Sequence, residues 1–508
     1  MLCGNPQISA YSVPTHGGRS HSATLAFAMT RAGMRTTLCA LVAVCITAAA
    51  PKGSDVQFIP LVDAEPILAA VPDLVPEPLR GLGRDGMAGA WMGWVAQRDS
   101  EIRARLERGD EDTLTNFLLF GTSFTREPRV TLAALSRANG KPLDALEAGS
   151  PLAGPVRRRA ADLVASAARP EQNERLRFAR RILERKGYVL KTREARPKAV
   201  AYLLEHFEEV IRENDRYAEL LKEAGQYKDR NQELNTRSTL FKARGVSLDT
   251  SWQPNLAIEL SLGALQQKGL LAPASVRRVG VIGPGLDFTD KEEGYDFYPP
   301  QTIQPFAVFD SLVRLGLSSA DSLEITTLDL SDRVNDHIRR ARARARTGTR
   351  YTIELTLDPA VPWKPEAVAY WKQWGSQIGT RAAPIQPPAE IGRIETRAVG
   401  INPAVVLRIT PRDLNIVAER LHFDDLRDRF DLVIATNVLV YYDLFEQGLA
   451  LQNVAAMLRP GGLFLSNDAL VEVAGAALHS AGSATMTYSD RKEDADYINW
   501  YQNSGPAR

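Results

Sequence analysis

Two glycines that follow an apolar run are the first residues in this chain whose spacing could support chemistry. The run Val276–Ile282 leads into Gly283-Pro284-Gly285. A tight glycine turn at the carboxyl end of a strand lets the backbone approach a bound ligand, as in nucleotide-binding α/β folds. Taken alone the signal is weak, because many loops have this composition.

A carboxylate stands at the end of the next apolar run. Leu323–Leu328 is followed by Asp329, and a carboxylate at this place can accept hydrogen bonds from both hydroxyls of a ribose. The alternative is that Asp329 caps a helix starting near Val334.

Polar residues also follow two later runs. Val405–Ile409 precedes Asp413, and Phe430–Ala435 precedes Asn437. Because the carboxyl ends of parallel strands meet at one edge of a sheet, both side chains are expected beside the glycines.

Two tyrosines just beyond Asn437 are candidates for substrate-facing groups. Tyr441 and Tyr442 can donate a hydrogen bond or, rarely, act as a base. The alternative is that one packs in the core while the other is exposed.

The elements that position these residues alternate between short β-rich runs and helical stretches after Gly245. This alternation predicts an α/β fold, a Rossmann-like doubly wound and mostly parallel sheet, within a domain covering 251–508. Insertions are expected near 287–305 and 358–395. The expected strands are Val276–Ile282, Leu323–Leu328, Tyr351–Leu357, Val405–Ile409, Phe430–Ala435 and Gly462–Ser466.

The preceding part of the chain has a different character. Residues 86–250 show helical spacing of apolar residues and predict an all-α domain, with an amphipathic stretch at Ala199–Tyr227. The partner of that stretch is another helix or a second subunit, so a homodimer through this domain is one possibility. Repeated prolines in 54–85 predict a linker.

The N-terminal residues resemble a targeting segment. Residues 1–33 lack apolar periodicity and are interpreted as an over-extended or disordered start, followed by a signal peptide or anchor at 34–53. If that signal is used, the protein is exported, periplasmic or anchored in a membrane through residues 36–50; otherwise it is cytoplasmic. The alternative is a buried N-terminal helix or tail.

Composition excludes several classes of site. A net charge of +1 argues against general attraction to nucleic acid, and the basic run Arg339–Arg350 is interpreted as a solvated helix face. All cysteines lie within the first 45 residues, so the folded body has no disulfide framework or cysteine-based zinc site. Its histidines show no metal-ligand spacing, and no metal is expected.

Several of these motifs occur in the order found in one enzyme superfamily. The glycine turn, Asp329, FDLVIATNVLVYYD and MLRPGGLFLSND resemble class I S-adenosylmethionine-dependent methyltransferases, with closest similarity to chemotaxis-receptor methyltransferases. The resemblance covers roughly 190 residues. It implies S-adenosylmethionine as cofactor and methyl transfer to an oxygen or nitrogen acceptor of unknown identity.

The resemblance also implies where the cofactor would bind. In order along the cofactor, the positions are Gly283 and Gly285 at the methionine end, Asp329 at the ribose with Leu330 beside it, Asp413 and Leu414 at the adenine, and Asn437 and Val438 beside the methyl group.

The first motif departs from the family pattern. Val281 stands where an acidic residue is usual, and Asp287 stands at the place of the final glycine. Asp287 is therefore a further cofactor-binding candidate. The alternative is a degenerate site on a non-catalytic binding or scaffold protein, possibly exported.

Overall fold

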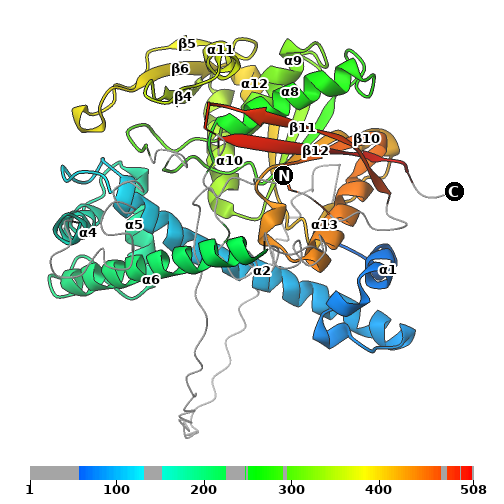
Figure 1. The fold of residues 1–508 in the computed structure, drawn as a ribbon, viewed down its shortest axis with the longest axis horizontal. Coiled ribbons are helices and arrows are strands. Elements are labelled where there is room, and N and C mark those ends of the chain that lie inside the picture. Colours follow the sequence, from blue (N-terminus) through cyan, green and yellow to red (C-terminus); the bar gives the residue numbers. More distant parts are fainter. Residues whose placement is uncertain are drawn as a thin grey trace, which may run out of the picture.

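The structure is a computed structural model that describes residues 56–130, 152–224, 246, 250–289, 295–468, 470, 477–491 and 494–505 (Figure 1). The expected over-extended start and the signal or anchor segment lie outside the described residues. Of the helices that are described, none is both long and apolar enough to span a membrane.

A seven-stranded sheet forms the centre of the described C-terminal part, in the order β11-β12-β10-β9-β2-β3-β7. The five strands from β10 to β7 pair in parallel, whereas β12 pairs antiparallel with β10 and with β11. The predicted Rossmann-like, mostly parallel sheet is thereby confirmed. The strands are β2 (Arg278–Ile282), β3 (Glu324–Asp329), β7 (Ile409–Asp413), β9 (Phe430–Ala435), β10 (Leu458–Ser466), β11 (Leu478–Thr487) and β12 (Ala495–Asn503).

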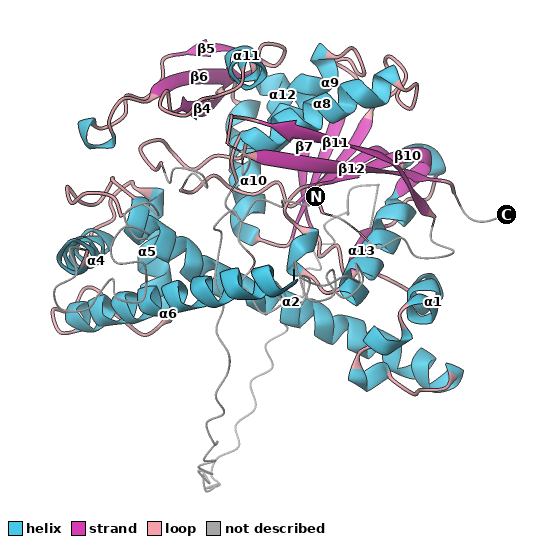
Figure 2. Ribbon diagram, viewed as in Figure 1, coloured by secondary structure: helices cyan, strands magenta, loops and turns pink. Residues whose placement is uncertain are grey.

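Helices cover both faces of this sheet (Figure 2), because its central strands are apolar on both sides. Successive residues of β9 join different core clusters: Leu432 and Ile434 face one cluster, while Val433 and Ala435 face the other. The first cluster includes α8 (Gln253–Gln267), α9 (Gln304–Arg314) and α10 (Asp332–Arg346), and the second includes α13 (Leu444–Met457).

The expected strand Tyr351–Leu357 exists but belongs to another sheet. As β4 it pairs antiparallel with β6 (Glu395–Ile401), which also pairs with β5 (Gly379–Ala382). The inserted unit is therefore larger than the predicted 358–395. Alternating apolar residues indicate a strand but carry no information about which sheet it joins.

A second strand was predicted in the wrong place. Pro403–Leu407 forms the short helix α12, and the third parallel strand is β7, which begins at Ile409. Asn402 caps this helix by accepting a hydrogen bond from the Ala404 N–H at 3.1 Å, and Pro403 occupies the first turn. Asn followed by Pro is a helix-start signal, which here outweighs the β-branched residues.

The tryptophans of the insertion form a small core. Trp371 and Trp374 are buried, and the Trp363 ring lies 5.6 Å from the Trp252 ring of the main domain. Helix α11 (Pro365–Gln373) carries part of this cluster. The aromatic residues thus hold the insertion against the domain.

The Pro-rich segment 54–85 is not a linker where it is described. Strand β1 (Val56–Phe58) pairs antiparallel with β8 (Glu419–Leu421), and helix α1 (Leu61–Ala70) packs on α13. The side chain of Ile67 packs directly against Gly448 of α13, so that a Cβ added at Gly448 would lie 2.8 Å from it. Pro72 and Pro78 lie in the first turns of short 3-10 helices rather than in an extended connection.

The described part of 86–250 is helical, as predicted, but it shares its core with the sheet. Figure 1 shows the 37-residue α2 (Arg84–Phe120) running from α5 past the α/β domain toward α1. Leu118 of α2 and Val281 of β2 belong to one core cluster. The other described helices here are α4 (Ala153–Ala167), α5 (Glu174–Arg185) and α6 (Ala195–Ala224).

Candidate functional site

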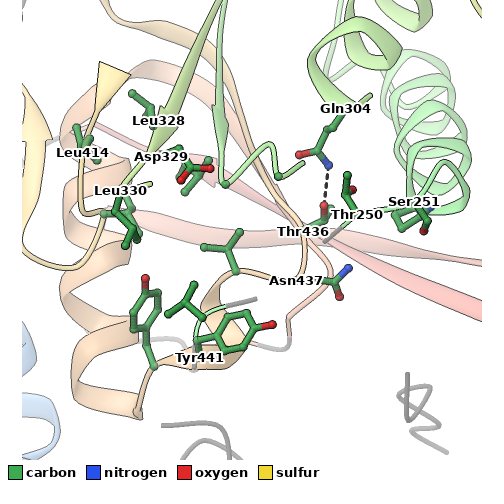
Figure 3. A pocket seen from close by; sticks show the side chains of 18 residues that line it. Thr250, Ser251, Gln304, Leu328, Asp329, Leu330, Leu414, Thr436, Asn437 and Tyr441 are labelled. Atoms are coloured by element: carbon green, nitrogen blue, oxygen red, sulfur yellow. Dashed lines mark hydrogen bonds between the residues drawn. The ribbon is translucent and has the colours of Figure 1, made fainter. Parts of the chain in front are cut away.

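A pocket opens at the carboxyl ends of β2, β3 and β9 (Figure 3). From β2 the chain first adds β3 and β7 on one side of the sheet and then returns to add β9 and β10 on the other side. The strand order therefore reverses between β2 and β9. Open α/β sheets bind ligands at such a switch point. The open volume is about 800 Å³, a value that includes solvent at the mouth.

The glycine turn forms one wall of the pocket. Gly283 and Gly285 have φ angles of +59° and +69°, a region that side chains disfavour. A Cβ on Gly283 would lie 2.6 Å from the Val438 side chain. The Gly283 N–H donates to the Leu328 carbonyl at 2.9 Å, so this wall is held to β3.

Asp329 ends β3 and lines the pocket with only 3% of its surface exposed. Its Oδ1 accepts a hydrogen bond from the Ser331 N–H at 2.8 Å. Its Oδ2 makes no hydrogen bond with the described residues. Burial raises the pKa of Asp329 to about 7, and the nearby N–H groups of Ser331 and Gly285 oppose that increase only in part.

The expected alternative role of Asp329 as a helix cap accounts for one oxygen only. Helix α10 begins at Asp332, and its N-cap is Ser331, which makes no side-chain capping bond. Oδ1 of Asp329 therefore holds the turn into the helix, while Oδ2 has no hydrogen bond with the described residues. A buried carboxylate oxygen without a donor is costly, so Asp329 remains a candidate ligand-binding group.

The loop after β9 is held in an uncommon conformation at the pocket. Asn437 has a φ angle of +57°, and its N–H and side-chain oxygen bond the amide of Asn467 at 2.7 and 2.9 Å. The Leu439 N–H donates to Asp468 at 3.0 Å. A non-glycine residue at such a φ is strained, and two side chains from the end of β10 stabilise it.

A polar wall of the pocket was not predicted from the sequence. Gln304, the first residue of α9, donates from Nε2 to Thr436 Oγ1 at 2.6 Å and is 3% exposed. Thr250 and Ser251 line the same side (Figure 3). The Gln-Pro pair at a helix start was the only available signal for Gln304, and it says nothing about a pocket.

Both candidate tyrosines line the pocket and both are buried, so neither is the exposed residue of the alternative. The Arg105 guanidinium lies 5.9 Å from the Tyr442 ring centre and donates to the Tyr441 carbonyl at 2.7 Å. Burial raises the pKa of Tyr442, so its phenol stays protonated near neutral pH. Tyr442 is therefore a poor general base.

Two of the candidate residues lie away from the pocket lining. Asp413 forms an ion pair with Arg103 at 2.7 Å, although its neighbour Leu414 lines the pocket beside Leu330. Asp287 is buried, and its Oδ2 accepts a hydrogen bond from Gln301 at 2.9 Å. Asp287 thus fastens its own loop and does not replace the acidic residue missing at Val281.

No protein-family model matches the chain, and no curated protein matches it. Three solved methyltransferase structures resemble it with low scores. Magnesium protoporphyrin IX methyltransferase from Synechocystis PCC 6803, with bound SAM, is 12% identical, with a TM-score of 0.23 over 56% of this chain and 91% of that one.

The other two solved structures have the same TM-score of 0.23. The CurJ carbon methyltransferase is 13% identical and is matched over 88% of this chain and 100% of its own. An O-methyltransferase family protein from Burkholderia thailandensis is 12% identical, over 84% and 100%. Because these scores are low, the fold class rests on the chain's own strand order.

Proposed function

We propose that this chain is an S-adenosylmethionine-dependent methyltransferase acting on an oxygen or nitrogen acceptor. The observation that carries the proposal is the buried Asp329 carboxylate, which lines the switch-point pocket and whose Oδ2 makes no hydrogen bond with the described residues. Ribose hydroxyls are suitable donors for a carboxylate at this place. A ligand that supplies them would offset the cost of burying the charge.

The remaining pocket walls fit the other parts of this cofactor. Leu330, Leu414 and Ile416 form an apolar side that suits the faces of an adenine ring. Gly283 and Gly285 present backbone rather than side chain, and such turns can approach a charged amino-acid end closely. These residues would hold the cofactor across the ends of β2, β3 and β9.

The bound cofactor would supply an electrophilic methyl carbon. The chain's own contribution is to place an acceptor in line with it, and alignment alone can lower a barrier by several kcal/mol, roughly 7 at the low end. Gln304 and Thr436 offer uncharged hydrogen-bonding groups on the pocket side away from Asp329. They can orient an acceptor but cannot remove its proton, so an already uncharged nitrogen or an acidic hydroxyl suits this wall.

Calorimetric titration of the purified chain with S-adenosylmethionine and S-adenosylhomocysteine tests the proposal. We expect micromolar binding of both, lost in Asp329→Ala because the ribose hydroxyls lose their acceptor. Asp428→Ala is a matched control, since it removes a carboxylate that pairs with Arg278 at 2.5 Å near the amino ends of the strands. The Asp428→Ala variant should bind both ligands with the same affinity as the natural chain.

Two results would contradict the proposal. The first is absence of binding by the natural chain while its thermal unfolding remains cooperative. The second is equal affinity in Asp329→Ala and the natural chain, because a ligand bound without Asp329 does not use the predicted ribose site. The first result would favour a binding or scaffold role for this fold, whereas the second would leave cofactor binding in place but without Asp329.

A further inference from the structure

A single arginine of α2 contacts the loop after β3, the end of β7 and the start of β8 (Glu419–Leu421). The Arg103 guanidinium donates to the Leu330 carbonyl after β3 at 3.4 Å and to Asp413 at the end of β7 at 2.7 Å. It also donates to Glu419 of β8 at 3.0 Å. A planar guanidinium with several fixed donors is suited to such a three-way contact, whereas an ammonium group is not.

A second set of hydrogen bonds ties the same loop to α2. Asn415 is fully buried; its backbone N–H donates to Glu419 at 2.8 Å and its side chain donates to Asp99 at 2.9 Å. Asp99 lies one turn before Arg103 on α2 and accepts from the Arg103 Nε at 3.0 Å. Arg103, Asp99, Asn415 and Glu419 therefore form a closed network.

The residues held by this network belong to the pocket, although Arg103 itself does not line it. Leu414 and Ile416 flank Asn415 and line the apolar side, and Leu330 lies directly after Asp329. Arg103 binds the Leu330 carbonyl and the side chain of Asp413, which precedes Leu414, while Ile416 directly follows Asn415. A change in the network would thus shift the apolar wall without removing any atom that faces the ligand.

The charges make Arg103 the centre of the network. Three carboxylates, those of Asp99, Asp413 and Glu419, lie within 3.0 Å of its guanidinium nitrogens. Without the arginine these anions would repel one another and the loops would separate, because like charges at short range are unfavourable.

We infer that Arg103 is a positioning residue for the adenosine end of the pocket, and that α2 is part of the binding site. This inference rests on the proposed function. Arg103 sets the distance between the Leu330 loop and the Leu414–Ile416 loop, and so the width of the slot for the adenine. The helical region therefore contributes to cofactor affinity by holding these loops in place.

The test compares two ligands on the full chain. Arg103→Ala should weaken the binding of S-adenosylhomocysteine and of adenosine by the same factor, about tenfold, since lost charge-assisted hydrogen bonds have this magnitude. Arg103→Lys should give an intermediate loss, because it keeps the charge but not the three-way contact. Arg278→Ala, which breaks an ion pair at the amino ends of the strands, should leave both affinities unchanged.

The outcomes distinguish failure of the role inferred for Arg103 from failure of the proposed function. If Arg103→Ala and Arg103→Lys both bind as the natural chain does, or if only S-adenosylhomocysteine binding weakens, the positioning role is refuted. If Arg103→Ala does not fold, Arg103→Lys decides by the same criterion. Absence of binding by the folded natural chain would refute the proposed function, and the role of Arg103 with it.

Discussion

The Asp329 carboxylate should make cofactor affinity depend on pH near neutrality. In the empty pocket its pKa is about 7, because burial disfavours the charged carboxylate. Ribose hydroxyls bind the ionised form more strongly, since hydrogen bonds to a charged acceptor are roughly twice as strong as neutral ones. Binding below that pKa must therefore release a proton, and affinity falls as pH falls.

The magnitude follows from linkage between proton release and binding. At one pH unit below the pKa of the empty protein, about ten proteins in eleven carry the proton, so the dissociation constant increases about tenfold. The increase continues at about tenfold per pH unit until the lower pKa of the bound state is reached. Above about pH 8 the affinity should no longer change.

The same pKa has the opposite consequence for stability. An acid whose pKa is higher in the folded state loses stability as pH rises from its unfolded value toward its folded value. Between 3.8 and about 7 this loss amounts to at most about 4 kcal/mol. Asp329→Asn should therefore raise the free energy of unfolding of the empty protein at about pH 8, while it weakens cofactor binding.

Calorimetry at several pH values and denaturant unfolding of both proteins check these expectations. In Asp329→Asn the remaining affinity should be independent of pH across the neutral range. A natural chain whose affinity is constant from about pH 5 to about pH 8 would refute the assignment of Asp329 as the ribose-binding group. So would an Asp329→Asn variant that keeps full affinity.

Three further changes test other parts of the structure. Gly283→Ala should cost about 1–3 kcal/mol in denaturant unfolding and weaken cofactor binding, because a side chain at φ +59° would lie 2.6 Å from Val438; unchanged unfolding would contradict the glycine turn. Gln304→Ala should leave S-adenosylhomocysteine affinity within about twofold but lower methyl transfer, once an acceptor is known, by about tenfold; an equal loss of both would place Gln304 with the cofactor instead. Ile67→Ala should reduce the free energy of unfolding by about 2–4 kcal/mol, whereas no change would restore the linker interpretation of this segment.

The sequence predicted those site residues whose position depends on local information. An apolar run that ends in a glycine, Asp or Asn places that residue at the carboxyl edge of the sheet, and Gly283, Asp329 and Asn437 all line the pocket. The rule failed for Asp413. It stands at the expected strand end, but Arg103, more than 300 residues away in sequence, binds its carboxylate outside the pocket.

Residues that depend on long-range packing could not be predicted in this way. Gln304 reaches the pocket because α9 begins there, and Asn467 reaches Asn437 because β10 lies beside β9. Neither contact leaves a pattern in the chain. The strand β4 failed for a related reason, since its alternating residues fit an antiparallel insertion as well as the parallel sheet.

The altered glycine motif makes the role proposed for α2 more important for cofactor binding. Val281 is fully buried in β2, so the methionine end of the pocket has no carboxylate at the position where the resemblance places one, and Asp287 is bound to Gln301 instead. In the proposed binding mode most of the specific contacts then lie at the adenosine end, with Asp329 and the loops held by Arg103. Adenosine alone should consequently keep most of the binding free energy of S-adenosylhomocysteine. Adenosine could instead bind more than about a thousandfold more weakly than S-adenosylhomocysteine, a difference of about 4 kcal/mol. The methionine end would then contribute most of the binding free energy, and the loops held by Arg103 of α2 would contribute less.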